Sequence, residues 1–129
     1  MMEPTKETTE YVEKIAEQSG KYKKEAYMFI FEALDYTLRN LKEHRHVTGR
    51  ELLHGISEYG RSEYGPMTKT VFEYWGVTKT EDFGRIVFDL VDAGLMGKTE
   101  TDSIDDFKNA YDFEEEFVKK YQEDRRKKT

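Results

Sequence analysis

Residues 24–44, "KEAYMFIFEALDYTLRNLKEH", form the stretch that decides the fold. Apolar residues recur along it at spacings of three and four, as they do on one face of an α-helix. The stretch has few β-branched residues and neither Gly nor Pro. It therefore predicts the central helix of the core, with a buried face made of Ala26, Phe29, Ile30, Ala33, Leu34, Leu38 and Leu41.

Shorter amphipathic segments lie on both sides of this stretch. Before it, "TEYVEKIAEQSG" predicts a short helix that ends near Gly20. After it, Thr48 and Glu51 match a capping box, which predicts a helix over residues 49–64. Gly65 and Pro66 then break the chain before a helix over residues 67–75. The inward-facing residues of these three helices are predicted to be Tyr11, Val12, Ile15, Ala16, Leu52, Leu53, Ile56, Tyr59, Met67, Val71, Phe72 and Trp75.

Two glycines fall inside the helix predicted over residues 49–64. An internal glycine costs a helix about 1 kcal/mol relative to alanine. Gly55 and Gly60 are therefore better explained as places where another helix comes close.

The second half of the chain carries similar signals. Thr78 and Glu81 form a second candidate capping box, for a helix over residues 80–94 that Gly94 ends. Asp112 is predicted to cap a last helix. Between these two helices, one strand of a small β-hairpin is predicted from Thr99, Thr101 and Ile104.

These elements predict an all-α or mostly α single domain of five to six helices over residues 10–121. Residues 1–9 are predicted to be a disordered N-terminus, and residues 122–129 a basic, frayed tail. Two interpretations of residues 48–112 stay open. They form either an ordinary part of the helical domain or a winged-helix-like subdomain that includes the small β-hairpin.

Composition limits the classes of protein to consider. A chain of 129 residues is long enough for one buried core, and the absence of cysteine excludes disulfides, thiolate catalysis and cysteine-based zinc sites. No apolar run approaches the ~20 residues that span a bilayer, and the N-terminal sequence lacks the pattern of a signal peptide. We therefore expect a cytoplasmic protein that does not bind membranes.

Charge is distributed unevenly and weighs against nucleic-acid binding. Residues 98–117 carry 2 basic and 8 acidic side chains, whereas residues 118–129 carry 6 basic and 2 acidic ones. The acidic segment lies where the wing of a winged helix would be, and it would repel the phosphates that dominate the affinity of DNA-binding proteins. The alternative function is a divergent winged-helix-like nucleic-acid-binding regulator. Its contacts would come from the tail residues Arg125, Arg126, Lys127 and Lys128.

Metal and cofactor sites receive little support from the sequence. His44, His46 and His54 do not provide a fixed third ligand for a zinc ion. The acidic residues from Asp102 to Asp112 do not match the spacing of a calcium-binding loop. No phosphate-binding or dinucleotide-binding glycine motif occurs, and neither Ser57 nor Ser62 lies in a nucleophile elbow. We expect no cofactor, no metal site and no enzymatic activity.

A cluster of aromatic residues, from Tyr59 to Trp75, is open to two interpretations. It is either the core of a helical domain poor in aliphatic residues, or a patch of rings that stay exposed and anchor a partner. Tyr74 falls off the apolar face of its helix and is the best candidate for such an anchor. The candidate partner-binding residues are Tyr74, Trp75 and Tyr64.

Several segments resemble an uncharacterised family of small conserved bacterial proteins, of the type found in Planctomycetes and Verrucomicrobia. They are "YKKEAYMFIFEALDYT", "HVTGRELLHGISEY", "GPMTKTVFEYWG" and "TEDFGRIVFDLVDAGLMGKTETDSIDDFKNAYDFEEEF". The resemblance covers residues 10–121, and "TEDFG" and "KTETDSIDDF" are its most distinctive motifs. It implies an intracellular domain and supplies no catalytic or binding residue, because the family has no assigned function.

Taken together, the sequence predicts a non-catalytic protein-interaction or adaptor module in the bacterial cytoplasm. The protein partner is not identified by the sequence, and no oligomeric state is predicted.

Overall fold

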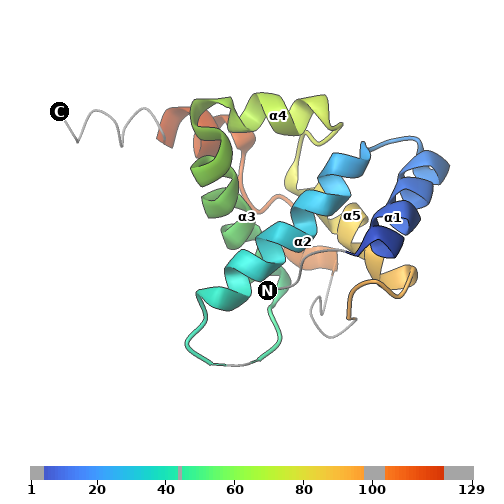
Figure 1. Ribbon diagram of the computed structural model, residues 1–129. Helices are drawn as coiled ribbons and strands as arrows, with labels where there is room; N and C mark the ends of the chain where they lie inside the picture. Colours follow the sequence, from blue (N-terminus) through green and yellow to red (C-terminus); the bar gives the residue numbers. More distant parts are fainter. Residues whose placement is uncertain (1–4, 44, 98–103, 121–129) are drawn as a thin grey trace.

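The computed structural model describes residues 5–43, 45–97 and 104–120 and shows an all-α domain (Figure 1). Within these residues there are five α-helices and no β-strand. The α-helices are α1 (Lys6–Ser19), α2 (Lys24–Arg39), α3 (Gly49–Tyr64), α4 (Thr68–Tyr74) and α5 (Thr80–Asp92). Single turns η1 (Gly65–Met67), η3 (Ile104–Phe107) and η4 (Glu115–Lys119) complete the described part.

Helix α2 lies at the centre and packs against α1, α3 and α5 (Figure 1). Ala26, Phe29, Ile30, Ala33 and Leu34 are buried, as the spacing predicted. The helix ends at Arg39, so residues 40–43 of the stretch that predicted it lie outside the helix. Leu38 and Leu41 are only partly buried against the core.

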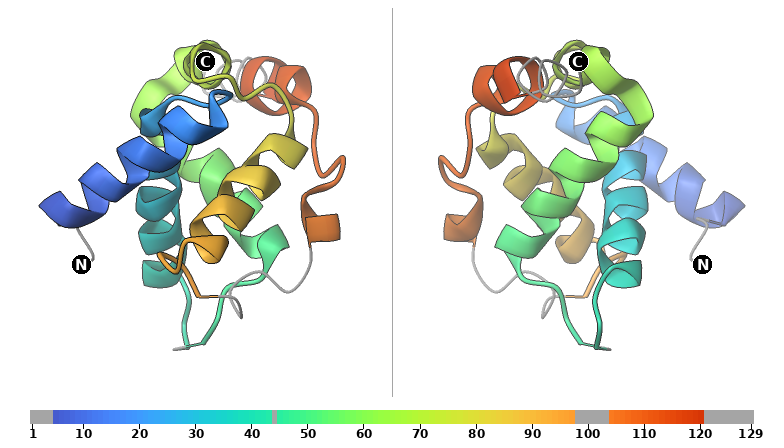
Figure 2. Two further views of the ribbon diagram at one scale, coloured as in Figure 1. Left: turned by 90° about the vertical axis from the view of Figure 1, so that its right-hand side faces the viewer. Right: turned by 90° about the vertical axis from the view of Figure 1, so that its left-hand side faces the viewer.

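Helix α1 covers one side of the molecule, and the C-terminal segment of residues 104–120 lies on the other side (Figure 2). The helix begins at Lys6, where Thr5 accepts a hydrogen bond from the Thr8 amide. The prediction of a disordered N-terminus over residues 1–9 is therefore wrong from residue 6 onward. The basic, frayed tail was predicted for residues 122–129, which lie outside the described residues.

Helix α3 has the predicted capping box, in which Thr48 and Glu51 exchange hydrogen bonds of 3.0 and 3.1 Å. The two internal glycines occur where other elements come close. A Cβ on Gly55 would lie 1.8 Å from Thr37 Oγ1 of α2, and one on Gly60 would lie 3.0 Å from the Phe72 ring. Both predictions for α3 are confirmed.

Phe72 of α4 is the centre of an aromatic core. Its ring lies between 5.3 and 5.9 Å, centroid to centroid, from five others, which come from four different parts of the chain. These rings belong to Phe29, Trp75, Phe83, Phe113 and Phe117. Most of the aromatic cluster seen in the sequence is therefore core.

Helix α5 begins one residue later than its predicted capping box implies. The side chain that bonds the free amides is Asp82, which accepts from the Thr78 and Lys79 N–H groups at 2.9 and 3.3 Å. Asp82 is only 2% exposed and also accepts a hydrogen bond from the Tyr22 hydroxyl. Thr78 with Glu81 was the wrong pair, because Lys79 is the N-cap residue and Asp82, three residues later, accepts from its amide.

The acidity of the α5 surface is lower than the sequence indicates. Asp82 is buried, and Asp89 is partly buried and accepts a hydrogen bond from Tyr27 Oη at 2.9 Å. Two of the four acidic side chains of α5 thus point inward. Glu81 and Asp92 remain at least partly exposed.

The predicted β-hairpin is contradicted where it can be compared. Ile104 begins the 3-10 turn η3 and does not form a strand, and Thr99 and Thr101 lie outside the described residues. No wing is seen in the described part of the chain, so the winged-helix-like interpretation of residues 48–112 gains no support. Asp112 does cap the following turn, where its carboxylate accepts from the Glu115 amide.

Two predicted core residues are exposed. Met67 is 54% exposed because η1, a 3-10 turn, precedes α4 and gives it a different position relative to the core. Tyr11 is 49% exposed, whereas its neighbour Val12 is fully buried. The inward face of α1 is thus narrower than its sequence predicted.

Candidate functional site

Tyr74 is the last residue of α4 and the most exposed large apolar side chain among the described residues, at 70%. Phe72 and Trp75, on the inner side of the same helix end, are buried. Tyr74 lies on a different face of the helix end from these two buried side chains, so its ring faces away from the core. The prediction of an exposed Tyr74 is confirmed.

The loop between α1 and α2 holds the end of α4 in place. The Lys23 amide donates to the Trp75 carbonyl at 3.1 Å, and Lys23 Nζ lies 4.8 Å from the centre of the Tyr74 ring. Gly76 has a φ of +93°, and a Cβ there would lie 2.5 Å from the Lys21 carbonyl oxygen. Only glycine fits this turn, and the turn holds the backbone next to Tyr74 in place.

A cavity of about 340 Å³ adjoins the Tyr74 ring. Its lining mixes carboxylates, ammonium groups and aromatic rings, and Lys24 Nζ and Glu13 Oε1 form an ion pair of 3.3 Å within it. We call this region the Tyr74 surface. It consists of Glu13, Ala16, Glu17, Tyr22, Lys23, Lys24, Glu25 and Tyr74.

The other predicted partner-binding residues belong to the core. Trp75 is only 7% exposed and packs between Phe29, Tyr64 and Phe72. Tyr64 is partly buried, with its ring 5.8 Å from that of Trp75. Trp75 was therefore a wrong prediction, because burying its indole contributes to the aromatic core. The alternative nucleic-acid residues Arg125, Arg126, Lys127 and Lys128 lie outside the described residues.

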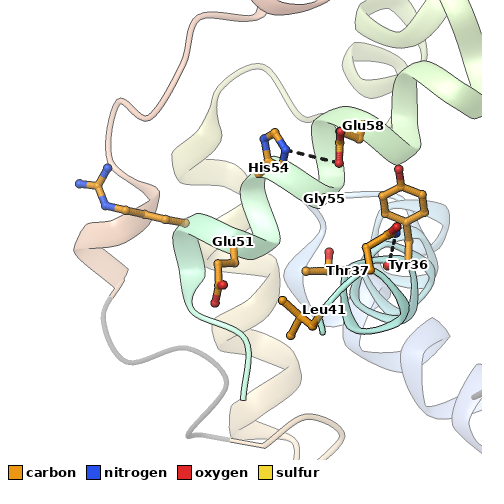
Figure 3. Close-up of a pocket in the computed structure, with 9 residues that line it drawn as sticks. Tyr36, Thr37, Leu41, Glu51, His54, Gly55 and Glu58 are labelled. Atoms are coloured by element: carbon orange, nitrogen blue, oxygen red, sulfur yellow. Dashed lines mark hydrogen bonds and ion pairs between the residues drawn. The ribbon is translucent and has the colours of Figure 1, made fainter. Parts of the chain in front are cut away.

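A second cavity, of about 430 Å³, lies between α2 and α3 (Figure 3). Contact between Gly55 and Thr37 brings the two helices together, and the cavity opens beside this contact. We call it the α2–α3 cleft. Its lining residues are Tyr36, Thr37, Asn40, Leu41, Arg50, Glu51, His54, Gly55 and Glu58.

The sequence pattern does not predict this cleft as a site. Gly55 was the only signal of the cleft in the sequence. It indicated that two helices pack closely, but it did not indicate the cavity beside their contact. The His54 side chain is 70% exposed, and its Nε2 lies 3.4 Å from Glu58 Oε1 (Figure 3).

No metal centre is found in the described part of the chain. No three His, Cys, Asp or Glu side chains there are arranged to hold an ion. Two acidic residues of the C-terminal segment have separate roles. Asp105 pairs with Lys108 at 2.8 Å, and Asp112 caps η4. His44 and Asp102 were among the residues considered for metal binding, and both lie outside the described residues.

The strongest pKa shifts belong to tyrosines with structural hydrogen bonds. Burial raises the pKa of Tyr22 above its usual range, and the bond to Asp82 raises it further. Burial likewise raises the pKa of Tyr111, whose hydroxyl donates to the Leu53 carbonyl at 3.0 Å. Each of these hydroxyls joins separate elements of the fold. Tyr22 also lines the Tyr74 surface, but its hydroxyl is already bonded to Asp82.

In comparisons with known proteins, no family model, curated protein or solved structure matches the chain. The resemblance to a bacterial family therefore stays a prediction. Among the helices of the described residues, none is both long and apolar enough to cross a membrane.

Proposed function

We propose that this chain is a non-catalytic protein-interaction or adaptor module that binds a protein partner through the Tyr74 surface. The observation that carries this proposal is the exposure of Tyr74 on a turn fixed by Gly76 and Lys23. Tyrosine is one of the residues most enriched at binding hot spots, because it buries a large ring and keeps a polar hydroxyl. An anchor that is already ordered loses little conformational entropy on binding.

The surroundings of Tyr74 support the same proposal. Charged residues of both signs border the ring, as in the polar rim that surrounds an apolar anchor in protein interfaces. Lys23 contacts the ring face, and Lys24 pairs with Glu13 on the other wall of the cavity. Both lysines could exchange these contacts for carboxylates of a partner.

The test compares two exposed aromatic residues on the same chain. Tagged wild type, Tyr74→Ala and Phe88→Ala are used to capture partners from the native cell, and the captured proteins are identified by mass spectrometry. Phe88 is 60% exposed on α5 and serves as the matched control. We expect Tyr74→Ala to weaken a specific partner about tenfold or more and Phe88→Ala to leave it bound.

Two results would contradict the proposal. One is a partner that both variants retain equally, with melting temperatures within about two degrees of wild type. The other is binding to duplex DNA or RNA with a steep salt dependence that shrinks when Arg125 and Arg126 are neutralised, which would favour the nucleic-acid alternative.

A further inference from the structure

Acidic and aromatic side chains gather where the α2–α3 cleft ends. The rings of Tyr36 and Tyr59 lie 5.5 Å apart, and the Tyr59 hydroxyl lies 3.4 Å from Glu32 Oε2. Glu58 lines the cleft beside Tyr36 (Figure 3). We call this group, together with Glu63, the acidic mouth of the cleft.

The carboxylates of the acidic mouth differ from their neighbours in having little compensation by cations. Among the ion pairs of the described residues, none includes Glu32 or Glu63, and Glu58 is paired only with His54. At the other end of the cleft, by contrast, Arg45 bonds both oxygens of Glu51. Negative charge is thus concentrated at one end.

The titration of the nearby groups is consistent with this uneven charge. Burial raises the pKa of Tyr59 to about 12, and the charges of Glu32 and Glu63 add to the effect. Burial also raises the pKa of Glu32; the bond from Tyr59 opposes this, and the charge of Glu63 reinforces it.

The walls of the cleft have the opposite character. Between the two helices they include the side chain of Leu41, the buried Thr37 and the backbone of Gly55. Arg50 and His54 also line the cleft, but both side chains are largely exposed. A ligand that fits both parts needs an apolar stem and a positively charged head. Arginine and lysine side chains combine these features, since their methylene stems pack on apolar surfaces while the charged group stays at the rim.

We propose that the α2–α3 cleft and its acidic mouth bind an arginine or lysine side chain from a basic segment of another polypeptide. The stem lies against Leu41 and Thr37, and the cationic head lies between Glu58, Glu32 and the faces of the Tyr36 and Tyr59 rings. Cations are attracted to such ring faces within about 6 Å. The chain's net charge of −6 favours the approach of a basic partner. This site is separate from the Tyr74 surface.

A peptide titration followed by NMR tests the proposal on the full chain. The probe is a capped Ala-Arg-Ala-Ala-Arg-Ala peptide, and its control carries citrulline, a neutral isostere, in place of arginine. We expect the arginine peptide to shift the backbone amides of residues 36–41 and 54–59, and to bind about threefold to tenfold more tightly than the citrulline peptide.

Matched variants separate this site from general attraction to an acidic protein. Glu32→Gln with Glu58→Gln should weaken the arginine peptide by a similar factor, and Glu7→Gln with Glu10→Gln on α1 removes the same charge elsewhere and should change it little. Equal losses in the two double variants would overturn the proposal, as would equal binding of both peptides or shifts confined to other surfaces. Tyr74→Ala should leave this titration unchanged, so failure here is distinguishable from failure of the Tyr74 surface.

Discussion

The contact between α2 and α3 and the attachment of residues 104–120 are built in different ways. Helices α2 and α3 meet along their length, with apolar faces in contact and Gly55 set directly against Thr37. The C-terminal segment forms only the short turns η3 and η4. It is attached by the buried rings of Phe107, Phe113 and Phe117 and by a few buried polar contacts. In one of these contacts, Thr80 Oγ1 donates to the Phe107 carbonyl at 2.7 Å and accepts from the Ala110 amide at 3.1 Å.

This difference determines how each region responds to change. Two helices packed along a continuous apolar face lose little when one polar bond at the surface is removed. A segment made of short turns has fewer contacts to share the loss than a pair of long helices, so a single buried bond carries more of its stability. Substitutions of each kind can measure the contrast.

Phe72→Ala should have the largest effect, because Phe72 belongs to both regions. Its ring contacts Phe29 of α2 and also Phe113 and Phe117 of the C-terminal segment. Truncating a fully buried Phe costs about 3–5 kcal/mol. We expect urea unfolding to show this loss, with hydrogen exchange rising in both regions together.

A milder substitution keeps that prediction measurable if Phe72→Ala does not fold. Phe72→Leu should lower the free energy of unfolding by about 1.5 kcal/mol or less. Faster exchange in only one of the two regions would mean that Phe72 does not link them.

Gly55→Ala should come next, and it acts on the helix contact alone. An alanine normally stabilises a helix interior by about 1 kcal/mol, so any loss of stability reports the contact with Thr37. We expect a net loss of about 2 kcal/mol, measured by urea unfolding.

A second substitution shows whether Thr37 is the cause. In the double variant Gly55→Ala with Thr37→Ala, the new methyl group occupies the space that the threonine hydroxyl leaves. The double variant should therefore be more stable than Gly55→Ala alone. Simple addition of the two single losses would show that the residues do not touch.

Thr80→Val should have a somewhat smaller effect, confined to the C-terminal segment. Valine keeps the shape of threonine but leaves the Phe107 carbonyl and the Ala110 amide without their partner. We expect a loss of about 1–2 kcal/mol and faster hydrogen exchange at Ala110. Thr70→Val, at an exposed position of α4, is the matched control and should stay within about 0.5 kcal/mol of wild type.

The same contrast separates what could be predicted from the sequence from what could not. The capping box at Thr48, the glycine end of α1 and the close approach at Gly55 are local signals, and the structure confirms all three. The attachment of Thr80 to Phe107 joins residues 27 apart in sequence. No local spacing or propensity encodes such a bond, so the sequence favoured a hairpin at Ile104 where the chain forms a 3-10 turn.

For the candidate site, the sequence could identify one residue and not its surroundings. Tyr74 lies off the apolar face of its helix, and helical spacing is enough to show this. Trp75 comes directly after it and is buried against Phe29 and Tyr64. These two residues belong to other helices, so the spacing within one helix does not reveal the burial. The walls of both cavities likewise come from helices whose packing angles the sequence does not specify.

Glu51→Gln gives the smallest expected effect and completes the comparison with a polar contact of the helix region. Arg45 bonds the Glu51 carboxylate, the Thr48 amide donates to it, and together they lower its pKa to about 2, from an ordinary value of 4.5. A pKa below its unfolded value means that the charged form stabilises the fold above about pH 4.5 and that this contribution is lost as the pH falls towards 2. Because Glu51 is near the surface, we expect Glu51→Gln to cost only about 0.5–1 kcal/mol at pH 7.

Thermal unfolding at several pH values should show the difference in stability between variant and wild type closing below pH 4.5. A gap that is larger than that of Thr80→Val, or that does not change with pH, would show that the helix region also depends on single polar bonds.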